Sequence, residues 1–493
     1  METIWDDHYP EGDLKMRSNS KKAALALAIS ACLISLPAEA EYQLQPAIPI
    51  DAQSENMLPP ALPIDGSGQT AQPSAPSMGQ PPMGQPPMGQ PSMGQQSDAT
   101  ELTGEVTVEN DSKTIVWQSI KTNKPDTCAV LARKKANVNI STTNIVKEGD
   151  SASEQDSNFT GRNAAILAND SKVTLSGSDV TTHGKGANGI FATGSKSEIN
   201  VSDVTIETTK DSSRGLDATF GGTINAEKVT ITTKGAHCAA IATDRGEGTI
   251  TAEDCKLETS GEGSPVIYST GNITLNSSYG VANGSEMAVV EGKNSISMRN
   301  TALFGYKLQG VMLYQSTSGD AAAGTATFTA DRSELHNEST GPVFFVTNTT
   351  AVANLSRSDV HSKGSVLANV AASRWGQSGA NGGDFTINAV KQGLSGDITC
   401  DNISRVTLNL TQKSSLTGAV NPDGKALYSA VSIDDASTWN VTKDSHVTVI
   451  KSGKADFSNI KSHGHTVTYD RSQNPQLDGR TYNLPGGGHL IPA

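Results

Sequence analysis

The chain has 493 residues and a formal net charge of −13, and it is 35% hydrophobic but only 4% aromatic. This apolar content is low for a globular protein of the same length, and it favours a fold in which each segment buries only a thin row of side chains. The acidity argues against nucleic acid and against an anionic bilayer as partners, because no basic face is available to neutralise phosphates.

The N-terminal segment up to Ala40 has the features of an export signal. Residues 1–15 are acidic and polar, so we expect translation to start at Met16. Residues 16–40 then read as a secretory signal peptide with a basic start, an apolar core and a small-x-small cleavage site, at Arg17–Lys22, Ala23–Leu36 and Ala38–Ala40. The apolar core is too short for a comfortable transmembrane span. Cleavage after Ala40 predicts a secreted or cell-surface protein that begins at Glu41.

A second interpretation of the same segment is a lipoprotein signal. The stretch Ile29–Cys32 resembles a bacterial lipobox, which would place a lipid on Cys32 and anchor the protein to a membrane. The apolar run continues through Leu36 to the better cleavage site, so soluble export is the favoured prediction.

Residues 41–100 are rich in Pro, Gln, Ser and Met, with MGQPP-like units repeated from Met78 to Gln95. Proline fixes φ and removes a backbone donor, so this segment is predicted to be a disordered linker. The evenly spaced methionines suggest a soft-metal site, but no His or Cys lies among them. A plain repeat without a metal is the favoured interpretation.

Six alternating apolar pairs recur at a nearly constant spacing between Lys172 and Met298. The pairs are Val173/Leu175, Ile199/Val201, Ile224/Ala226, Ile250/Ala252, Ile273/Leu275 and Ile296/Met298. The period is about 25 residues, which is the range of a solenoid, a propeller or another array of repeats.

Each repeat carries three apolar sites, and the spacing from the first to the third is identical in three successive units. The sites of these units are Val173, Val180 and Ile190, then Ile199, Val204 and Leu216, then Ile224, Val229 and Ile241. Three short strands per turn predict an all-β fold, a right-handed parallel β-helix over residues 101–424, with coils about 4.8 Å apart. Leucine-rich repeats are disfavoured because Leu is sparse, and propellers because no Trp-Asp or kelch-type mark recurs.

The ends of the predicted β-helix differ from its middle. Glu101–Ile140 is predicted to supply strands that cover the first coil, because an open end would expose strand edges. Glu148–Gly161 is predicted to be a polar loop that interrupts the coils. Residues 425–493 are predicted to form a C-terminal β cap, in which Trp439 covers the apolar row of the last coil.

Two long loops are predicted after Met298, where the repeat spacing becomes irregular. They are Gln315–Gly324 and Ser373–Gly383, and the second holds Arg374 and Trp375. Loops that project from a rigid scaffold commonly carry binding residues.

The segment Ser437–Val447 carries a resemblance to a known family. Its residues STWNVT, DS and V resemble the end of the β-helical passenger of bacterial autotransporters and pertactin-like adhesins, and the coils with GIFATG-type turns look like pectin-lyase-like right-handed β-helices. The resemblance extends over Glu101–Ala493; it is specific near Trp439 and generic in the coils. It implies a surface adhesin. Autotransporters end in a membrane β-barrel, which the sequence up to Ala493 lacks, so the resemblance implies export by another route.

No catalytic, cofactor-binding or metal-binding residue is predicted. Pectin-lyase-like folds include polysaccharide lyases and glycoside hydrolases, and glycoside hydrolysis needs placed carboxylates. The clearest acidic pair, Asp434–Asp435, lies in the predicted cap, and Ser462–His465 only superficially echoes a Gly-His-Gly signature. The remaining candidates are single residues, predicted to lie in polar turns: Asp179, Asp203, Asp254, His183, His237 and His361.

Four cysteines follow the export segment, and none has the C-x-x-C spacing of a zinc site. Cys238 and Cys255 are separated by less than one repeat, so a disulfide between them and burial as free thiols are both open.

The sequence predicts an exported, non-catalytic, adhesin-like β-helix whose loops bind an unknown ligand, with a glycan or a host surface protein as candidate partners. The alternative is a divergent polysaccharide lyase or glycoside hydrolase of the pectin-lyase-like fold. The fold alone does not choose between them. The lack of clustered acidic residues in the sequence favours the binding protein.

Overall fold

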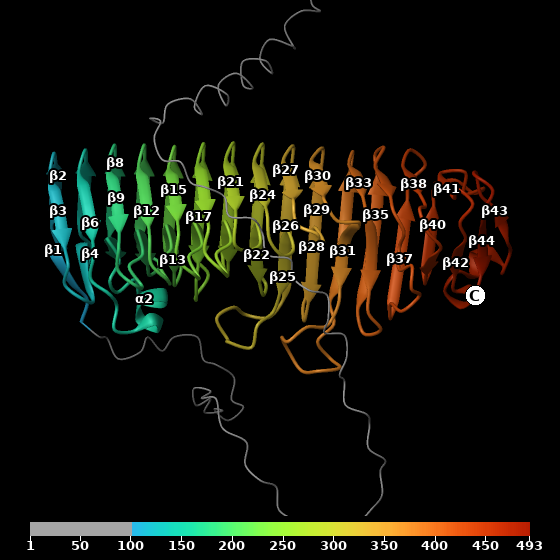
Figure 1. The fold of residues 1–493 in the computed structure, drawn as a ribbon, viewed down its shortest axis with the longest axis horizontal. Coiled ribbons are helices and arrows are strands. Elements are labelled where there is room, and N and C mark those ends of the chain that lie inside the picture. The colour runs from blue at the N-terminus through green and yellow to red at the C-terminus, as the bar shows by residue number, and fades with distance from the viewer. Residues whose placement is uncertain (1–100) are drawn as a thin grey trace, which may run out of the picture. The chain divides into compact units, whose positions relative to one another are not determined.

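The computed structural model describes residues 101–493. The predicted upstream segment, signal peptide, lipobox cysteine Cys32 and linker all lie outside the described residues. Within them the predicted all-β parallel β-helix is confirmed: short strands stack in parallel register along the whole length of the solenoid (Figure 1).

Three parallel sheets, here named A, B and C, form the walls of the solenoid. Sheet A consists of β1 Thr103–Glu109, β4 Thr127–Arg133, β7 Ile166–Asn169, β10 Ile190–Thr193, β13 Leu216–Thr219, β16 Ile241–Thr243, β19 Ile267–Ser269, β22 Ala288–Glu291, β25 Val311–Tyr314, β28 Phe344–Thr347, β31 Val366–Val370 and β34 Asp397–Cys400.

Sheet B is the longest and runs through β2 Ser112–Val116, β5 Asn137–Ser141, β8 Lys172–Ser176, β11 Glu198–Ser202, β14 Thr223–Glu227, β17 Thr249–Glu253, β20 Asn272–Asn276, β23 Ser295–Arg299, β26 Thr325–Asp331, β29 Thr350–Ser356, β32 Asp384–Val390, β35 Arg405–Thr411, β37 Tyr428–Ile433 and β40 Val449–Ser452. Sheet C contains β3 Ser119–Thr122, β6 Asn144–Lys147, β9 Asp179–Thr182, β12 Thr205–Thr208, β15 Thr230–Thr233, β18 Lys256–Thr259, β21 Tyr279–Ala282, β24 Ala302–Gly305, β27 Glu334–Asn337 and β30 Asp359–Ser362.

Two four-stranded sheets complete the C-terminal part. Sheet D is parallel and contains β33 Gly393–Ser395, β36 Ser415–Thr417, β38 Thr438–Asn440 and β41 Ile460–Lys461. Sheet E contains β39 Ser445–Val447, β42 Val467–Tyr469, β44 His489–Pro492 and the antiparallel β43 Tyr482–Asn483. Within residues 101–493 the helical segments are α2 Glu154–Thr160 and two short 3₁₀ turns, η1 Arg471–Gln473 and η2 Pro475–Leu477.

Each coil runs from sheet A to sheet B and then to sheet C, and the alternating pairs found in the sequence face the core from sheet B. Ile199 pairs directly with Val173 on one side and with Ile224 on the other, and all three side chains are fully buried. Stacking of successive coils therefore removes these side chains from water, which a single coil could not do.

The corner between sheets B and C is a tight turn that repeats in successive coils. One residue there has a left-handed backbone, such as Asp203 (φ 54°) and Asp254 (φ 54°), which Asn, Asp and Gly adopt most readily. The next residue is buried in the corner, and where it is Ser or Thr its hydroxyl can accept a hydrogen bond from the backbone of the preceding coil, as when Ser333 N donates to Ser358 Oγ over 3.1 Å. The corners are thus built from turn chemistry, as predicted for Asp203 and Asp254.

The structure corrects the second apolar site of the predicted repeat. Ile206 and Ile231, not Val204 and Val229, occupy the inward place that Val180 has in the earlier coil. The two valines lie in the buried corner instead, because a second pair of apolar residues follows them by two positions. Asp179 likewise begins β9 and is not in the corner position of Asp203.

The first coil is regular, so the expected covering strands at 101–140 are themselves a coil. Its strands β1, β2 and β3 pair with β4, β5 and β6 on one side. Lys113 occupies the inward column at the place of Val138, and its side chain is exposed. A charge at an inward position of an edge strand opposes further strand addition, so this end is protected by a lysine.

At the other end, parallel pairing continues beyond the predicted boundary at Gly424, since β37, β38, β40 and β41 extend the stack. Trp439 is fully buried as predicted, but it lies between Leu416 and Ile460 and so is followed by another coil. The 3₁₀ turns, β43 and β44 follow.

Candidate functional site on the outer face of sheet A

Three segments project from the regular coils of the described solenoid, and all of them lie along its lower side in Figure 1. They are helix α2, the first loop at Gln315–Gly324 between β25 and β26, and the second loop around Ser373–Gly383 between β31 and β32. Both loops were predicted from the repeat spacing and are confirmed as loops. The segment Glu148–Gly161 was predicted to be a polar loop, but it contains the helix.

Helix α2 has clear start and stop signals. Ser153 caps its N-terminus by accepting a hydrogen bond from the backbone of Asp156, and Gly161 ends it with a left-handed φ of 71°. Thr219 on β13 donates a hydrogen bond to the Phe159 carbonyl over 2.8 Å. The helix is therefore attached to the outer face of sheet A. It precedes β7 in the chain, and β13 lies two coils beyond β7.

Two buried carboxylates lie near this helix. Asp217 alternates with the core residues of β13 and so points outward, yet its side chain is fully buried. The Arg214 guanidinium lies 3.2 Å from Asp244 and 3.9 Å from Asp217. Burial, with the charge of Asp244, raises the pKa of Asp217 well above its usual range, and burial also raises the pKa of Asp244 against the opposing effect of Arg214. The single positive charge of Arg214 thus faces two buried carboxyl groups. It can balance only one negative charge, which favours protonation of one carboxyl group of the pair.

A second polar group continues along the same face. Glu291 on β22 is buried and accepts hydrogen bonds from the hydroxyls of Tyr268 over 2.6 Å and Tyr314 over 2.8 Å. Ser316 of the first loop also donates to it. Burial, together with the nearby Glu291 charge, raises the pKa of Tyr314, so the phenol stays protonated as a donor. We refer to Asp217, Asp244, Tyr268, Glu291 and Tyr314 as the sheet A strip.

Both loops fold back over this strip. Asp320 of the first loop accepts two hydrogen bonds from Arg245, whose guanidinium also lies 4.0 Å from the centre of the Phe159 ring of α2. The ring of Trp375 in the second loop packs 5.4 Å from that of Tyr314, and Arg374 lies over Trp375 at 4.7 Å. Helix, loops and strip therefore form one connected surface.

The sequence did not reveal the buried pair Asp217 and Asp244, which share the Arg214 guanidinium. Asp217 and Asp244 belong to different coils, and they lie together at Arg214 only because coils stack. Glu291 lies further along the same face. The signal present in the sequence is the placing of Arg214 and Asp217 in one unit and of Asp244 and Arg245 in the next.

The residues singled out in the sequence do not assemble into a site. Asp434 accepts hydrogen bonds from backbone groups of Gln412 and Ala436, so it stabilises a turn. The imidazole of His183 contacts the Thr209 hydroxyl over 3.1 Å, and the His361 ring packs at an angle against that of His336 at the outer face of sheet C. The thiols of Cys128, Cys238, Cys255 and Cys400 are free and buried, so Cys238 and Cys255 are not paired.

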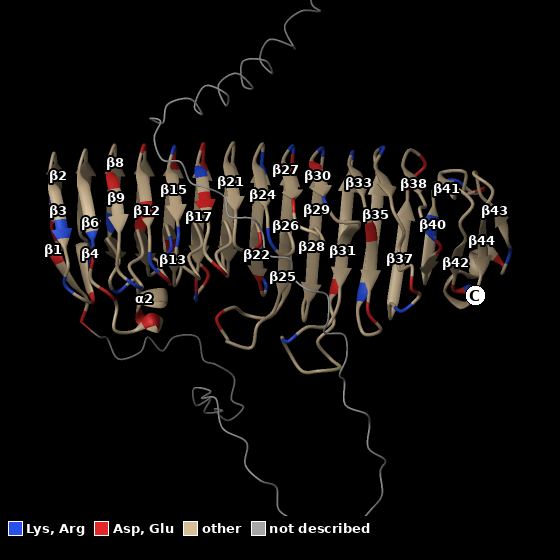
Figure 2. Ribbon diagram, viewed as in Figure 1, with Lys and Arg blue, Asp and Glu red and all other residues tan. Residues whose placement is uncertain are grey.

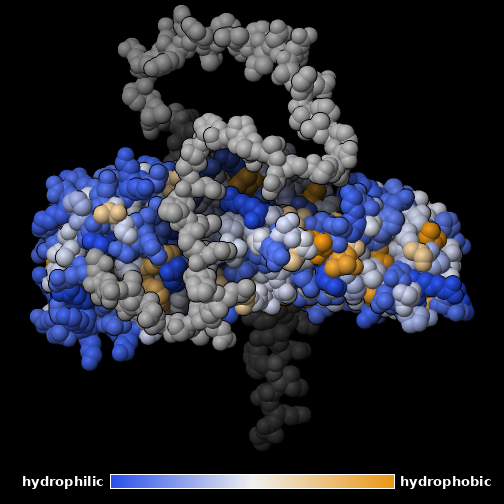
Figure 3. Space-filling view, turned by 90° about the horizontal axis from the view of Figure 1, so that it is seen from below, coloured by the Kyte–Doolittle hydropathy of each residue, from blue (hydrophilic) through white to orange (hydrophobic). Residues whose placement is uncertain are grey.

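Among residues 101–493, no group of three or more His, Cys, Asp or Glu side chains is arranged to hold a metal ion. The part of the chain that the structure describes also contains no helix with the length and apolarity needed to cross a bilayer. Acidic and basic residues are interspersed along the solenoid (Figure 2), and the visible part of the lower face is mostly hydrophilic with separate apolar spots (Figure 3).

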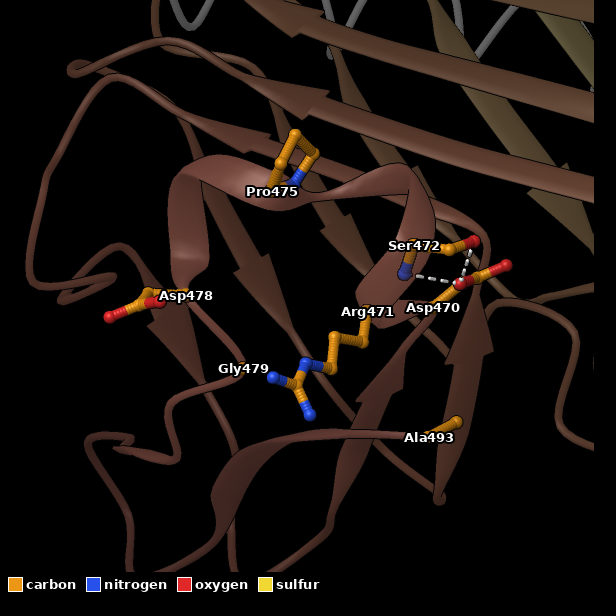
Figure 4. A pocket seen from close by; sticks show the side chains of 7 residues that line it. All are labelled: Asp470, Arg471, Ser472, Pro475, Asp478, Gly479 and Ala493. Carbon is orange, nitrogen blue, oxygen red and sulfur yellow. Dashed lines mark hydrogen bonds between the residues drawn. The ribbon is translucent and has the colours of Figure 1, made fainter.

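A hollow of about 550 Å³ lies near the C-terminus, lined by Asp470, Arg471, Ser472, Pro475, Asp478, Gly479 and Ala493 (Figure 4). Its Asp470 carboxylate is already used, because it accepts two hydrogen bonds from Ser472 over 2.7 Å each. None of the residues that line the hollow is buried, so the sheet A strip is the stronger candidate site.

Comparisons with known proteins return no match to any family model, any curated protein or any solved structure. The structure itself defines the class of protein as a parallel β-solenoid with one outer face covered by loops.

Proposed function

We propose that this protein is an exported, non-catalytic binding scaffold of the adhesin-like kind, and that ligand binds at the loops over the sheet A strip. The observation that carries the proposal is the placing of the helix and both long loops over one face, while the corners between sheets B and C keep short turns. The stability of a solenoid comes from stacking of its coils and does not require the helix and both loops to lie on one face, whereas a binding site would.

The second loop supplies the contact residues. Arg374 is exposed and Trp375 is half-buried, and the contact between the tilted rings of Trp375 and Tyr314 holds the indole in place. Tryptophan and arginine are the residue types that contribute most to binding when they are held rigidly, because little side-chain entropy is then lost. A glycan or a surface protein fits such a contact.

The test is a glycan and matrix-protein array, probed with the wild type and with Trp375→Ala and Arg374→Ala. We expect binding to a defined ligand that each variant weakens at least tenfold, with an unchanged melting temperature. Tyr306→Ala is the matched control, because Tyr306 is 54% exposed but lies outside these loops. Equal binding by Trp375→Ala and wild type would remove the loop from the site, and no binding to any array member would contradict the scaffold function.

A second candidate function is glycoside or polyuronide cleavage, and the Asp217–Asp244 pair is the observation that favours it. A carboxyl group with a raised pKa next to a second carboxylate is the arrangement that general acid catalysis uses. Release of reducing ends from a panel of polysaccharides, abolished in Asp217→Asn, would support the enzyme. The burial of Asp217 favours the binding scaffold, since a catalytic acid must reach its substrate.

Export is part of the proposal and is carried by the sequence of residues 16–40. N-terminal sequencing of material recovered outside the cell is expected to give Glu41 as the first residue. A lipid-modified Cys32 as the first residue would instead assign the protein to a membrane anchor.

A further inference from the structure

One outward column of sheet B contains only uncharged polar side chains in thirteen of its fourteen strands, and Lys451 of β40 ends it. Strand pairing aligns one residue from each of thirteen consecutive strands, β2 to β37, and every one is Thr, Asn or Ser: Thr114, Asn139, Thr174, Asn200, Asn225, Thr251, Thr274, Ser297, Thr329, Asn354, Asn388, Asn409 and Ser432. We refer to this set as the polar column. All of its members are half-buried or exposed.

The neighbouring columns of the same face carry charge at some positions. The column on one side is charged at Lys172 and Glu198 and uncharged from Thr223 to Ala430. The column on the other side is charged at Glu227, Glu253, Arg299 and Asp331. Of these three outward columns, the polar column alone is uncharged over all thirteen strands.

Hydrogen bonds between neighbouring coils fix the carboxamides of this column. Asn225 donates to Asn200, Asn388 to Asn354 and Asn409 to Asn388, each over 2.9 Å. An Asn side chain has two N–H donors and two acceptor lone pairs. Each ladder bond uses only part of this capacity, so the column presents oriented donors and acceptors to solvent along its length.

We infer that the polar column binds a neutral, extended 1,4-linked polysaccharide that lies along the solenoid axis. The coils of a parallel solenoid repeat about every 4.8 Å, and thirteen of them extend over about 58 Å. This repeat is close to the length of one pyranose unit in an extended chain, so each sugar would meet one hydroxyl or carboxamide group of the column. A neutral chain avoids the repulsion that the net charge of −13 would exert on an acidic one.

The direction in which the column continues without interruption is the solenoid axis, which fits a linear polymer. Lys172 and Glu198 interrupt the uncharged column on one side, and Glu227, Glu253, Arg299 and Asp331 interrupt the column on the other side. The strands of sheet B lie side by side along the length of the solenoid in Figure 1, which leaves the axial direction continuous. This binding surface is independent of the loops proposed to bind ligand over sheet A.

Titration calorimetry with soluble β-1,4-mannan, with β-1,4-linked gluco-oligosaccharides of different lengths and with polygalacturonate tests the inference on the full chain. Neutral chains should bind, and the affinity should rise at least tenfold between a short oligosaccharide and one twice its length, because each added coil contributes a contact. Polygalacturonate should bind more weakly than mannan. Affinity independent of chain length, or no binding of any neutral chain, would overturn the inference.

Variants that place charge in the polar column give the sharper test. The triple variant Asn225→Glu, Thr251→Glu and Thr274→Glu should lose at least tenfold in affinity for mannan, and the corresponding triple Lys variant should lose as much, because the ligand is neutral. Thr181→Glu, Thr205→Glu and Thr230→Glu on the outer face of sheet C form the matched control, and they should bind as the wild type does. Circular dichroism and melting temperature confirm that each variant is folded.

Two further results separate this surface from the other functions. Trp375→Ala should retain mannan binding, whereas loss of both mannan and array binding in that variant would place both ligands at the second loop and overturn the assignment to sheet B. Thermal hysteresis of ice growth in the absence of polysaccharide, abolished by the triple Glu variant, would assign the polar column to ice and likewise overturn the inference.

Discussion

Trp439 is the largest fully buried side chain in the described residues, and its indole N–H donates to the Gly418 carbonyl over 2.9 Å. Replacement by Ala removes this hydrogen bond and leaves a cavity, and such a change typically costs about 3–5 kcal/mol. We therefore expect Trp439→Ala to lower the melting temperature clearly, as measured by calorimetry. Trp375→Ala is the matched control, because it makes the same substitution at a half-buried site, and it should change the melting temperature little. Wild-type stability in Trp439→Ala with lost ligand binding would instead make Trp439 a recognition residue.

The raised pKa of Asp217 makes a prediction about pH. A carboxyl group whose folded-state pKa lies above the unfolded value of about 3.9 stabilises the fold at low pH, and this contribution is lost as pH rises through the folded-state pKa. Asp217→Asn does not titrate, so it should melt higher than the wild type at pH 8 and approach it at pH 4. A melting-temperature series over this range is the measurement. A difference that does not vary with pH would show that Asp217 is ionised throughout.

At the scale of the strand, the sequence predicted sheet B well because its residues alternate. Ile199 and Val201 face the core while Asn200 faces solvent, and this alternation is visible without a structure. The sheet A strands were predicted less completely, since Leu216–Thr219 is buried on both faces. A run such as this gives no sign of which residue points outward.

The sheet A strip could not be predicted for the same reason. Whether Asp217 is buried depends on what covers it, and α2 and the first loop lie far from it in the sequence. The loops themselves were predictable, because irregular spacing in a regular repeat has few other causes. The way in which the loops fold back across several coils was not predictable, because it depends on single contacts such as that between Arg245 and Asp320.

A charge introduced into the inward column tests the stacking of coils. Ile224 is fully buried between Ile199 and Ile250, and Ile224→Asp places an unpaired carboxylate there, at a cost of more than about 4 kcal/mol. Because repeats contact only their neighbours, we expect hydrogen exchange to rise in β11, β14 and β17 first. Asn225→Asp introduces the same group at the adjacent outward position and should leave exchange near the wild-type level. Uniform loss of protection over the whole chain would argue against local unfolding.

For the whole molecule, the strand register between coils predicts that deletion of one complete coil is tolerated and deletion of part of a coil is not. Thr249 pairs with Asn272, so deletion of Thr249–Gly271 removes one coil and leaves every remaining strand in line with a partner. We expect this protein to fold, with a β-type circular dichroism spectrum and a cooperative melt. Deletion of only the first half of that segment shifts sheets A and C against sheet B, so it should give insoluble or unfolded protein. Equal folding of both deletions would contradict a register fixed by stacking.

The contact between Arg245 and Asp320 gives the solenoid a mechanical property. Most contacts join only adjacent coils, so a chain pulled from its two ends should unravel one coil at a time at nearly constant force. Arg245 follows β16 and Asp320 follows β25, and this pair therefore ties together coils that the strands alone would release in sequence. Under load, the ends should peel away first and the central block should break in a single larger step. The segments that cover the sheet A strip would then also decide how long the folded surface survives under shear.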